Sequence, residues 1–255
     1  MMEKLTGTKE WAMININIQR GCEHGCRYCY ARYFAVKRFK RCTDEQWLNP
    51  LIDNDKVDRC YSKQKGVVMF PSSHDITPRN ISECMCVLRK LLDAGNRILI
   101  VSKPHWDCIT IICETFSEHR HQIILRFTVG SKDNDILRFW EPNAPYFGER
   151  VACLRYAYRL GYQTSVSCEP YLDSNVIDLF LAVKAWTTHS FWTGKLRDFE
   201  RRIDMSYVTS EQQDKFVRPL RDAQSEEAVW KIYKHLNFEH LVMWKDSIRK
   251  VIERR

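Results

Sequence analysis

Three closely spaced cysteines constrain this chain more than any other feature of its sequence. Cys22, Cys26 and Cys29 form the pattern C-x3-C-x2-C, directly after a run that alternates apolar and polar residues. One short loop with this spacing can wrap a metal cluster, because each thiolate reaches a different iron at a low loop-closure cost. Three thiolates leave one iron of a 4Fe–4S cluster without a protein ligand, and an open metal position is typical of chemistry rather than of scaffolding. Gly21 and Gly25 allow the backbone to approach such a cluster closely.

A zinc site and a chance group of buried cysteines are the alternatives. Tetrahedral structural zinc needs four ligands, and this motif lacks the second cysteine or histidine pair that would complete them. The spacing, the aromatic residue Tyr28 directly before the last cysteine, and the preceding strand together favour the iron–sulfur interpretation.

This motif resembles the signature of the radical S-adenosylmethionine (radical SAM) superfamily. The resemblance implies that Cys22, Cys26 and Cys29 hold a 4Fe–4S cluster, with Tyr28 at the cofactor site. It implies that the open iron binds the amino and carboxylate groups of SAM. One electron, supplied by an external reductant of the flavodoxin or ferredoxin type, would then cleave SAM to a 5′-deoxyadenosyl radical that abstracts hydrogen from a substrate.

Strand and helix patterns alternate along the first three quarters of the chain. The predicted strands are Met13–Gln19, Gly66–Phe70, Arg97–Ser102, Ile123–Val129, Tyr162–Cys168 and Ser190–Thr193. Such alternation predicts right-handed βαβ units with a parallel sheet, and six units are fewer than the eight that close a full barrel. We therefore expect an α/β fold, a partial (β/α)6 TIM-type barrel of the radical SAM type over residues 1–194. Residues 195–255 are expected to form a charged, mainly helical C-terminal extension that packs on the barrel, with helices at Glu226–His235 and Phe238–Arg255.

Segments beyond the cysteines resemble spore photoproduct lyase and its small bacterial and phage-borne relatives of unassigned function. They are RFTV at 126–129, ILRFWEPNAP at 136–145, GER at 148–150 and LGY at 160–162. This resemblance implies SAM contacts at the ends of strands. Ser73 and Asp75 would hold the amino group, Lys103 the carboxylate and Glu169 the ribose hydroxyls or the substrate. Thr128 matches the serine of an S-x-N motif, and Ser131 would substitute for the asparagine that Gly130 replaces. For each residue the alternative is a turn cap or an ordinary loop polar group.

One departure from that pattern bears on the substrate. Spore photoproduct lyase returns a hydrogen atom from a cysteine just after the second strand, and here 67–78 contains no cysteine. The departure speaks against repair of a thymine dimer and leaves a nucleobase substrate open. Cys168 and Tyr171 are the candidates for a radical relay, although a buried cysteine more commonly fills a core.

Charge indicates what kind of substrate the chain meets. The formal net charge is +8, which suits a polyanion such as DNA or a nucleotide. A basic segment, residues 27–41, interleaves six lysines and arginines with aromatic residues, as in surfaces that bind phosphates and stack bases. An ordinary helix that buries its aromatic residues gives the same pattern.

These features rank three functions. The first is a radical SAM enzyme that acts on a DNA or nucleotide base in modification or repair. The second is a radical SAM enzyme that acts on a peptide or small metabolite. The third is a non-catalytic iron–sulfur protein that binds nucleic acid or senses redox state. No apolar run approaches the ~20 residues that span a bilayer, and the polar segment 1–9 does not resemble a signal peptide, so we expect a cytoplasmic protein without membrane contact.

Overall fold

The computed structural model describes residues 6–206 and 208–254. In this part of the chain, seven strands form one curled, entirely parallel sheet in the order β1-β4-β5-β6-β7-β8-β9. The strands are β1 (Ile14–Asn15), β4 (Val67–Phe70), β5 (Arg97–Ser102), β6 (Ile123–Thr128), β7 (Gln163–Cys168), β8 (Ser190–Thr193) and β9 (Val242–Trp244). The predicted α/β partial barrel is confirmed, with one strand more than the six expected.

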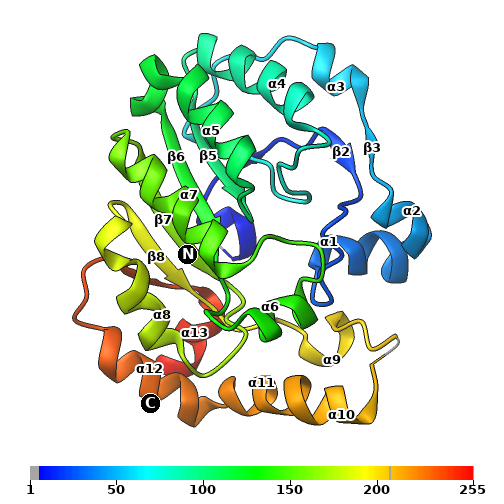
Figure 1. Cartoon of the computed structure of the whole chain (residues 1–255), viewed down its shortest axis with the longest axis vertical. Helices are drawn as coiled ribbons and strands as arrows, with labels where there is room; N and C mark the ends of the chain where they lie inside the picture. Colours follow the sequence, from blue (N-terminus) through cyan, green and yellow to red (C-terminus); the bar gives the residue numbers. More distant parts are fainter. Residues whose placement is uncertain (1–5, 207, 255) are drawn as a thin grey trace.

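Helices cover the outer side of this sheet (Figure 1). They follow the strands in turn as α4 (Ile81–Asp93), α5 (Trp106–Thr115), α6 (Asn134–Trp140), α7 (Phe147–Arg159) and α8 (Val176–Val183). Helix α4 shows why the sequence forms them: its buried residues recur at helical spacing. The helix ends before Gly95, whose positive φ of 75° suits the left-handed turn after a helix.

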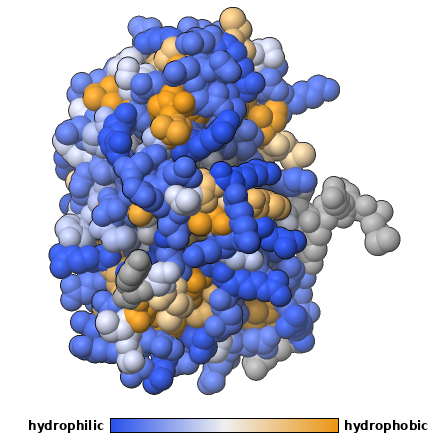
Figure 2. Space-filling view, turned by 90° about the vertical axis from the view of Figure 1, so that its right-hand side faces the viewer, coloured by the Kyte–Doolittle hydropathy of each residue, from blue (hydrophilic) through white to orange (hydrophobic). Residues whose placement is uncertain are grey.

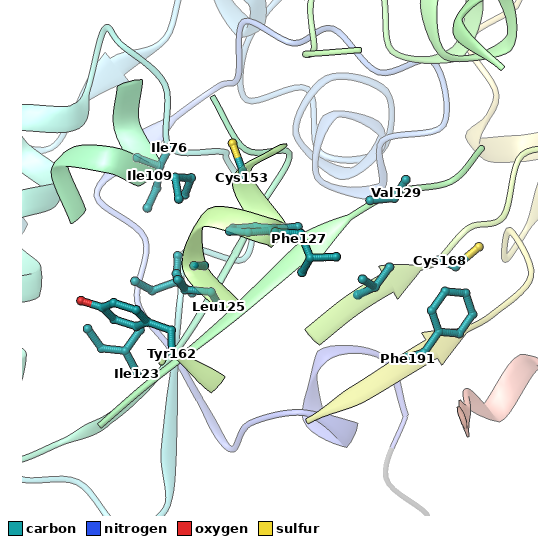
Figure 3. Packing of buried hydrophobic residues seen from close by; sticks show 14 of the residues in the cluster. Ile76, Ile109, Ile123, Leu125, Phe127, Val129, Cys153, Tyr162, Cys168 and Phe191 are labelled. Carbon is teal, nitrogen blue, oxygen red and sulfur yellow. The ribbon is translucent and has the colours of Figure 1, made fainter. Parts of the chain in front are cut away.

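Period-two alternation divides the strand residues between two cores. On β6, Ile123, Leu125 and Phe127 face the helices and join the main hydrophobic cluster, part of which Figure 3 shows. Ile124 faces the barrel interior, where it packs with Met69, Leu99 and Ala12. The N-terminal segment therefore fills one end of the barrel, and Figure 1 shows it in the middle of the molecule.

The N-terminal strand differs from the prediction. Met13–Gln19 was expected as one strand, but only β1 joins the main sheet. The chain then turns away to form β2 (Gln19–Arg20), which pairs antiparallel with β3 (Leu51–Ile52). Between them, the Asn17 side chain accepts hydrogen bonds from the backbone N–H groups of Ser72 (2.7 Å) and Ser73 (2.8 Å). This excursion carries the cysteine loop over the mouth of the barrel. Short helices α1 (Tyr30–Arg32), α2 (Asp44–Leu48) and α3 (Asn54–Asp58) complete the region.

The C-terminal part differs more. The single helix expected over Phe238–Arg255 is wrong, because this segment contains β9 and only then α13 (Asp246–Ile252). Strand β9 pairs with β8, so the sheet takes its last strand from beyond residue 195. Residues 210–223 of this part are also helical. The remaining helices are α9 (Phe199–Arg202), α10 (Ser210–Gln212), α11 (Arg218–Ala223) and α12 (Glu226–Leu236).

The surface drawn in Figure 2 is mostly hydrophilic, with hydrophobic residues in separate patches. Within the described residues, none of the helices has both the length and the apolar character needed to cross a bilayer.

Candidate functional site

The cysteine loop lies between β2 and α1 and is held by backbone contacts. The Cys22 N–H donates to the Trp47 carbonyl at 2.9 Å, and the Cys29 sulfur accepts from the Arg32 N–H at 3.4 Å as the cap of α1. Gly21 has a positive φ of 91°, and a Cβ there would lie 2.4 Å from the Trp47 oxygen. Only glycine fits this position, because any side chain would displace the backbone of α2.

All three cysteines of the motif line one cavity of about 520 Å³ at the mouth of the barrel. They are free thiols; Cys22 and Cys26 are buried and Cys29 is half-buried. The carboxyl ends of neighbouring strands supply the rest of the wall, as expected for a parallel barrel. The predicted residues that share this cavity are Tyr28, Ser73, Asp75, Lys103, Thr128 and Glu169. A cavity of this size accommodates a cofactor as large as SAM.

Asp75, after β4, is the centre of a buried polar network beside Cys22. Its Oδ1 accepts from the Lys103 N–H at 2.8 Å and from the Ser102 hydroxyl at 3.1 Å. Its Oδ2 lies 2.8 Å from His24 Nδ1 and 3.4 Å from Lys103 Nζ. Burial alone would raise the pKa of the Asp75 carboxyl, but Lys103 and His24 outweigh it and hold that pKa well below its ordinary value. Asp75 therefore presents a charged carboxylate to the cavity.

His24 is a member of this network that sequence reasoning missed. It lies between two of the cysteines and is fully buried. Its Nδ1 contacts Asp75, and its Nε2 lies 2.8 Å from Nε2 of His105. Its position inside the cysteine loop was the only signal in the sequence.

The donor set fits an iron–sulfur cluster. Burial raises the pKa of the Cys22 thiol to about 12, and the nearby Asp75 carboxylate adds to the rise. A metal among these sulfurs would reverse that effect, because coordination deprotonates a thiol. Cys22, His24 and Asp75 also bring ligand atoms within 4.8 Å of one another. Since both His24 nitrogens are already engaged, that trio is satisfied without a metal, whereas the three thiols facing the cavity are suited to one.

The loop between α6 and α7 braces the cysteine loop from behind. The Arg27 N–H donates to the Trp140 carbonyl at 2.9 Å, and the Asn143 amide donates to the Glu23 carbonyl at 2.8 Å. Between these contacts, the Tyr28 hydroxyl donates to the buried carboxylate of Glu141. The WEPN stretch was noted in the sequence only as a resemblance, and these contacts give it a structural role.

Arg150 completes that support. Its guanidinium pairs with Glu141, and it also donates to the carbonyls of Pro145 at 2.7 Å and Thr128 at 3.1 Å. Both members of the ion pair are fully buried. Tyr28 thus lines the cavity and anchors the cysteine loop through its hydroxyl.

Glu169 reaches the cavity from the end of β7. It lies 3.3 Å from Nζ of Lys245, a buried cation that also lies 3.2 Å from Glu10. Burial raises the pKa of the Glu169 carboxyl to about 7 despite the opposing effect of Lys245. Lys245 thus joins Glu169 to Glu10, two carboxylates that are distant in the sequence, and the sequence did not predict this.

Three predicted site residues are not brought to the cavity. The Ser131 hydroxyl donates to Asp173, and Ser131 is absent from the cavity wall. At neighbouring Gly130, a Cβ would lie 2.8 Å from Leu172 and 2.9 Å from the Pro170 oxygen, so no asparagine fits there. Cys168 and Tyr171, the candidates for a radical relay, are also outside the wall.

Strand parity explains the position of Cys168. On β7 the cavity side is taken by Ser167, so its neighbour Cys168 faces the hydrophobic core, where Figure 3 shows it near Phe191. Tyr171 is fully buried and donates its hydroxyl to the Ala223 carbonyl at 3.1 Å.

The basic segment 27–41 makes several contacts within the chain. Arg32 pairs with Asp44 at 2.9 Å and with Asp204 at 2.7 Å, and Lys37 pairs with Asp44 at 3.5 Å. Arg27 donates to the Phe139 carbonyl at 2.9 Å. Arg27, Arg32 and Lys37 are thus engaged in contacts within the chain.

Comparison with known proteins agrees with this fold. Two solved structures of spore photoproduct lyase mutants, one with a dinucleoside spore photoproduct and one with AdoMet and that product, superpose with a TM-score of 0.58. Identities are 14% and 15%, over 91% of this chain and 76% of the lyase. The resemblance inferred from the sequence is thereby confirmed at the level of the fold.

Sequence comparison adds one viral protein. The uncharacterized protein ORF301 of Acidianus two-tailed virus is 26% identical over 178 residues, which is 66% of this chain and 58% of that protein. The match thus spans little more than half of the viral protein's length. No protein-family model matches the sequence.

Proposed function

We propose, from the fold of spore photoproduct lyase and the cysteine loop at its mouth, that this chain is a radical SAM enzyme. One observation carries the proposal: three thiols of a C-x3-C-x2-C loop share a single cavity with the charged pair Asp75 and Lys103. Such a cavity offers ligands for three irons of a cluster. Beside Cys22 it also offers a carboxylate and an ammonium that match the amino and carboxylate groups of SAM. A protein that only stores or senses a cluster has no need of this second pair.

The residues of the chain would have distinct roles. Cys22, Cys26 and Cys29 would hold a 4Fe–4S cluster, and the chemistry expected there is one-electron cleavage of SAM to methionine and a 5′-deoxyadenosyl radical that takes hydrogen from a substrate. Asp75, fixed by Lys103 and His24, would accept hydrogen bonds from the SAM ammonium. Lys103, whose pKa is raised well above its ordinary value by Asp75 against the effect of burial, stays protonated and can pair with the SAM carboxylate.

The electron is proposed to come from an external flavodoxin- or ferredoxin-type protein. A second, smaller cavity of about 220 Å³ reaches Cys29, and cations dominate its wall. They are Arg27, Arg32, Lys37, Arg201 and Arg202, against one carboxylate, Asp204. A basic surface beside a cluster ligand suits an acidic electron donor. A reducing cytoplasm would keep the thiols free for the cluster.

A DNA or nucleotide base is the proposed substrate class. The fold is similar to that of an enzyme solved with a dinucleoside spore photoproduct, and the net charge is +8. Segment 67–78, which includes β4 and the residues after it, contains no cysteine. We therefore propose modification or repair of a base without the hydrogen-donor cysteine of the lyase.

Anaerobic reconstitution with iron and sulfide tests the chemistry. The reduced protein should convert SAM to methionine and 5′-deoxyadenosine, measured by chromatography and mass spectrometry. Oligonucleotides deuterated in their bases and sugars should then pass label into 5′-deoxyadenosine. A reconstituted protein that binds four irons but never cleaves SAM would support the non-catalytic alternative. Label transfer from peptides and not from oligonucleotides would overturn the substrate class.

A further inference from the structure

The wall of the main cavity is strongly cationic. Among the described residues of its wall, six lysines and arginines stand against two carboxylates. They are Lys9, Lys103, Lys195, Arg197, Arg202 and Lys245, against Asp75 and Glu169. Lys103 is paired with Asp75, and Lys245 lies between Glu10 and Glu169. Three of the remaining cations, Lys195, Arg197 and Arg202, belong to the segment that follows β8.

This segment, 195–202, is incompletely neutralised. No carboxylate of the described chain lies within ion-pair distance of Lys195 Nζ, although the residue is half-buried. Arg197 lies 3.6 Å from Asp246, a long ion pair, and its side chain is 35% exposed. Arg202 pairs at 3.2 Å with Asp198, which is itself mostly exposed to water. Half-buried cations with weak partners favour an anionic ligand, because an incoming anion compensates for their lost hydration.

The backbone of the segment is fixed, so its cations are presented at set positions. The Lys195 N–H donates to the Ser247 hydroxyl at 3.0 Å, and the buried Leu196 donates its N–H to the Gln224 side chain at 3.0 Å. At its far end, the Asp204 N–H donates to the Arg27 carbonyl at 2.7 Å, and Figure 1 shows α9 near α1. The segment is therefore held by hydrogen bonds near both of its ends as it runs from the end of β8 toward the cysteine loop.

Strand order separates this segment from the SAM-binding pair. Lys103 follows β5 and Lys195 follows β8, which are three strand spacings apart in the sheet. At about 4.8 Å per spacing this is ~14 Å along the sheet. A SAM molecule that binds Asp75 and Lys103 has already used its amino and carboxylate groups there, which leaves the cations after β8 for a second ligand.

We propose that Lys195, Arg197 and Arg202 form a subsite for a phosphate group of the substrate. The inference rests on the proposed function and narrows it, since it selects a substrate that carries its phosphate next to the base under attack. Two guanidinium groups and an ammonium match a phosphodiester or phosphomonoester, whose oxygens accept several charge-assisted hydrogen bonds. Burial also lowers the pKa of the Lys195 ammonium, an effect that a bound phosphate would offset.

The experiment measures how binding changes when one charge is removed from the ligand and when two charges are removed from the protein. The probe is a thymidine dinucleotide with a single phosphodiester, and its partner is the same dinucleotide with an uncharged methylphosphonate linkage. Affinities are measured by calorimetry on the reconstituted, unreduced protein with SAM present. The variant is Lys195→Gln with Arg197→Gln. The control is Lys132→Gln with Arg159→Gln, which removes two charges from exposed positions outside the cavity wall.

Loss of two partly exposed charge-assisted contacts should weaken phosphodiester binding on the order of tenfold to a hundredfold. Binding of the methylphosphonate and of SAM should not change, and the control should match the parent. Equal losses for both dinucleotides would overturn the phosphate assignment, as would a loss of SAM affinity alone, which would make these cations SAM ligands. SAM cleavage by the parent protein tests the proposed function separately. If the parent cleaves SAM but binds the phosphodiester and the methylphosphonate dinucleotides equally, the proposed function stands and only the phosphate subsite is wrong.

Discussion

Removing the Arg150 guanidinium is the most severe test of how the cysteine loop is held. Arg150→Met preserves most of the side-chain volume but leaves the Glu141 carboxylate without its cation in a fully buried position. It also leaves the carbonyls of Pro145 and Thr128 without a donor. Breaking a buried ion pair by removing one partner costs about 3–5 kcal/mol, because the other charge remains desolvated. For a chain of this size the melting temperature should fall by roughly 6–20 °C.

Urea unfolding followed by tryptophan fluorescence measures this change. The midpoint should fall while the slope with denaturant stays constant, which marks a change in stability rather than in compactness. Arg159→Met is the matched control, since Arg159 lies on the same helix, α7, but is exposed. Adding Glu141→Gln to Arg150→Met should recover part of the loss, because it removes the unpaired charge. A loss for Arg150→Met below about 1 kcal/mol, equal to the control, would refute the argument that this buried pair supports the loop.

The other predictions concern the cofactor site and its pH dependence. Alanine at any one of the three loop cysteines should abolish the iron–sulfur absorbance near ~400 nm and SAM cleavage, whereas Cys84→Ser, in the core, should keep both. Lys103→Ala should weaken SAM binding roughly thirtyfold in calorimetry with the cluster intact, since one charge-assisted contact is worth on the order of 2 kcal/mol; unchanged affinity would remove Lys103 from the site. Burial raises the pKa of the Glu169 carboxyl from 4.5 to about 7. Between pH 4.5 and 7 the folded state therefore binds a proton at Glu169 that the unfolded state has lost, so the free energy of unfolding declines as the pH rises across this window. Glu169→Gln should lessen that decline in urea titrations from pH 4.5 to 7, and an identical pH profile for variant and parent would contradict the shift.

The sequence was sufficient where a local pattern and the fold agree. Apolar runs such as Arg97–Ser102 formed strands, and polar residues in the loops that follow β4 and β5, Asp75 and Lys103, reached the same cavity. Parallel strands make this prediction reliable, because their carboxyl ends meet at one edge of the sheet. Parity within β7 could also have shown that Ser167, and not Cys168, faces the cavity.

Other elements depended on contacts distant in sequence. Val242–Trp244 lies in a stretch with helical apolar spacing, and it becomes a strand because the edge of β8 is available to pair with it. Lys245 is buried because it pairs with Glu10 and Glu169, which are both distant from it in the sequence. A local sequence pattern cannot predict contacts between residues so far apart in the chain.

The division of the cavity wall suggests how one fold can keep its chemistry and change its substrate. The cysteine loop and the ends of β4 and β5 form the half of the wall with the thiols, Asp75 and Lys103. The other half includes the segment after β8 and Lys245. The Lys245 side chain approaches the backbone of Gly194 closely, and a Cβ on residue 194 would lie 2.9 Å from it. Substitutions at Lys195 and Arg197 can therefore alter what binds at the end of β8 without replacing the residues proposed to hold the cluster. SAM cleavage without substrate and affinity for substrate should accordingly respond to different sets of residues, and this independence makes the two assignments separable by experiment.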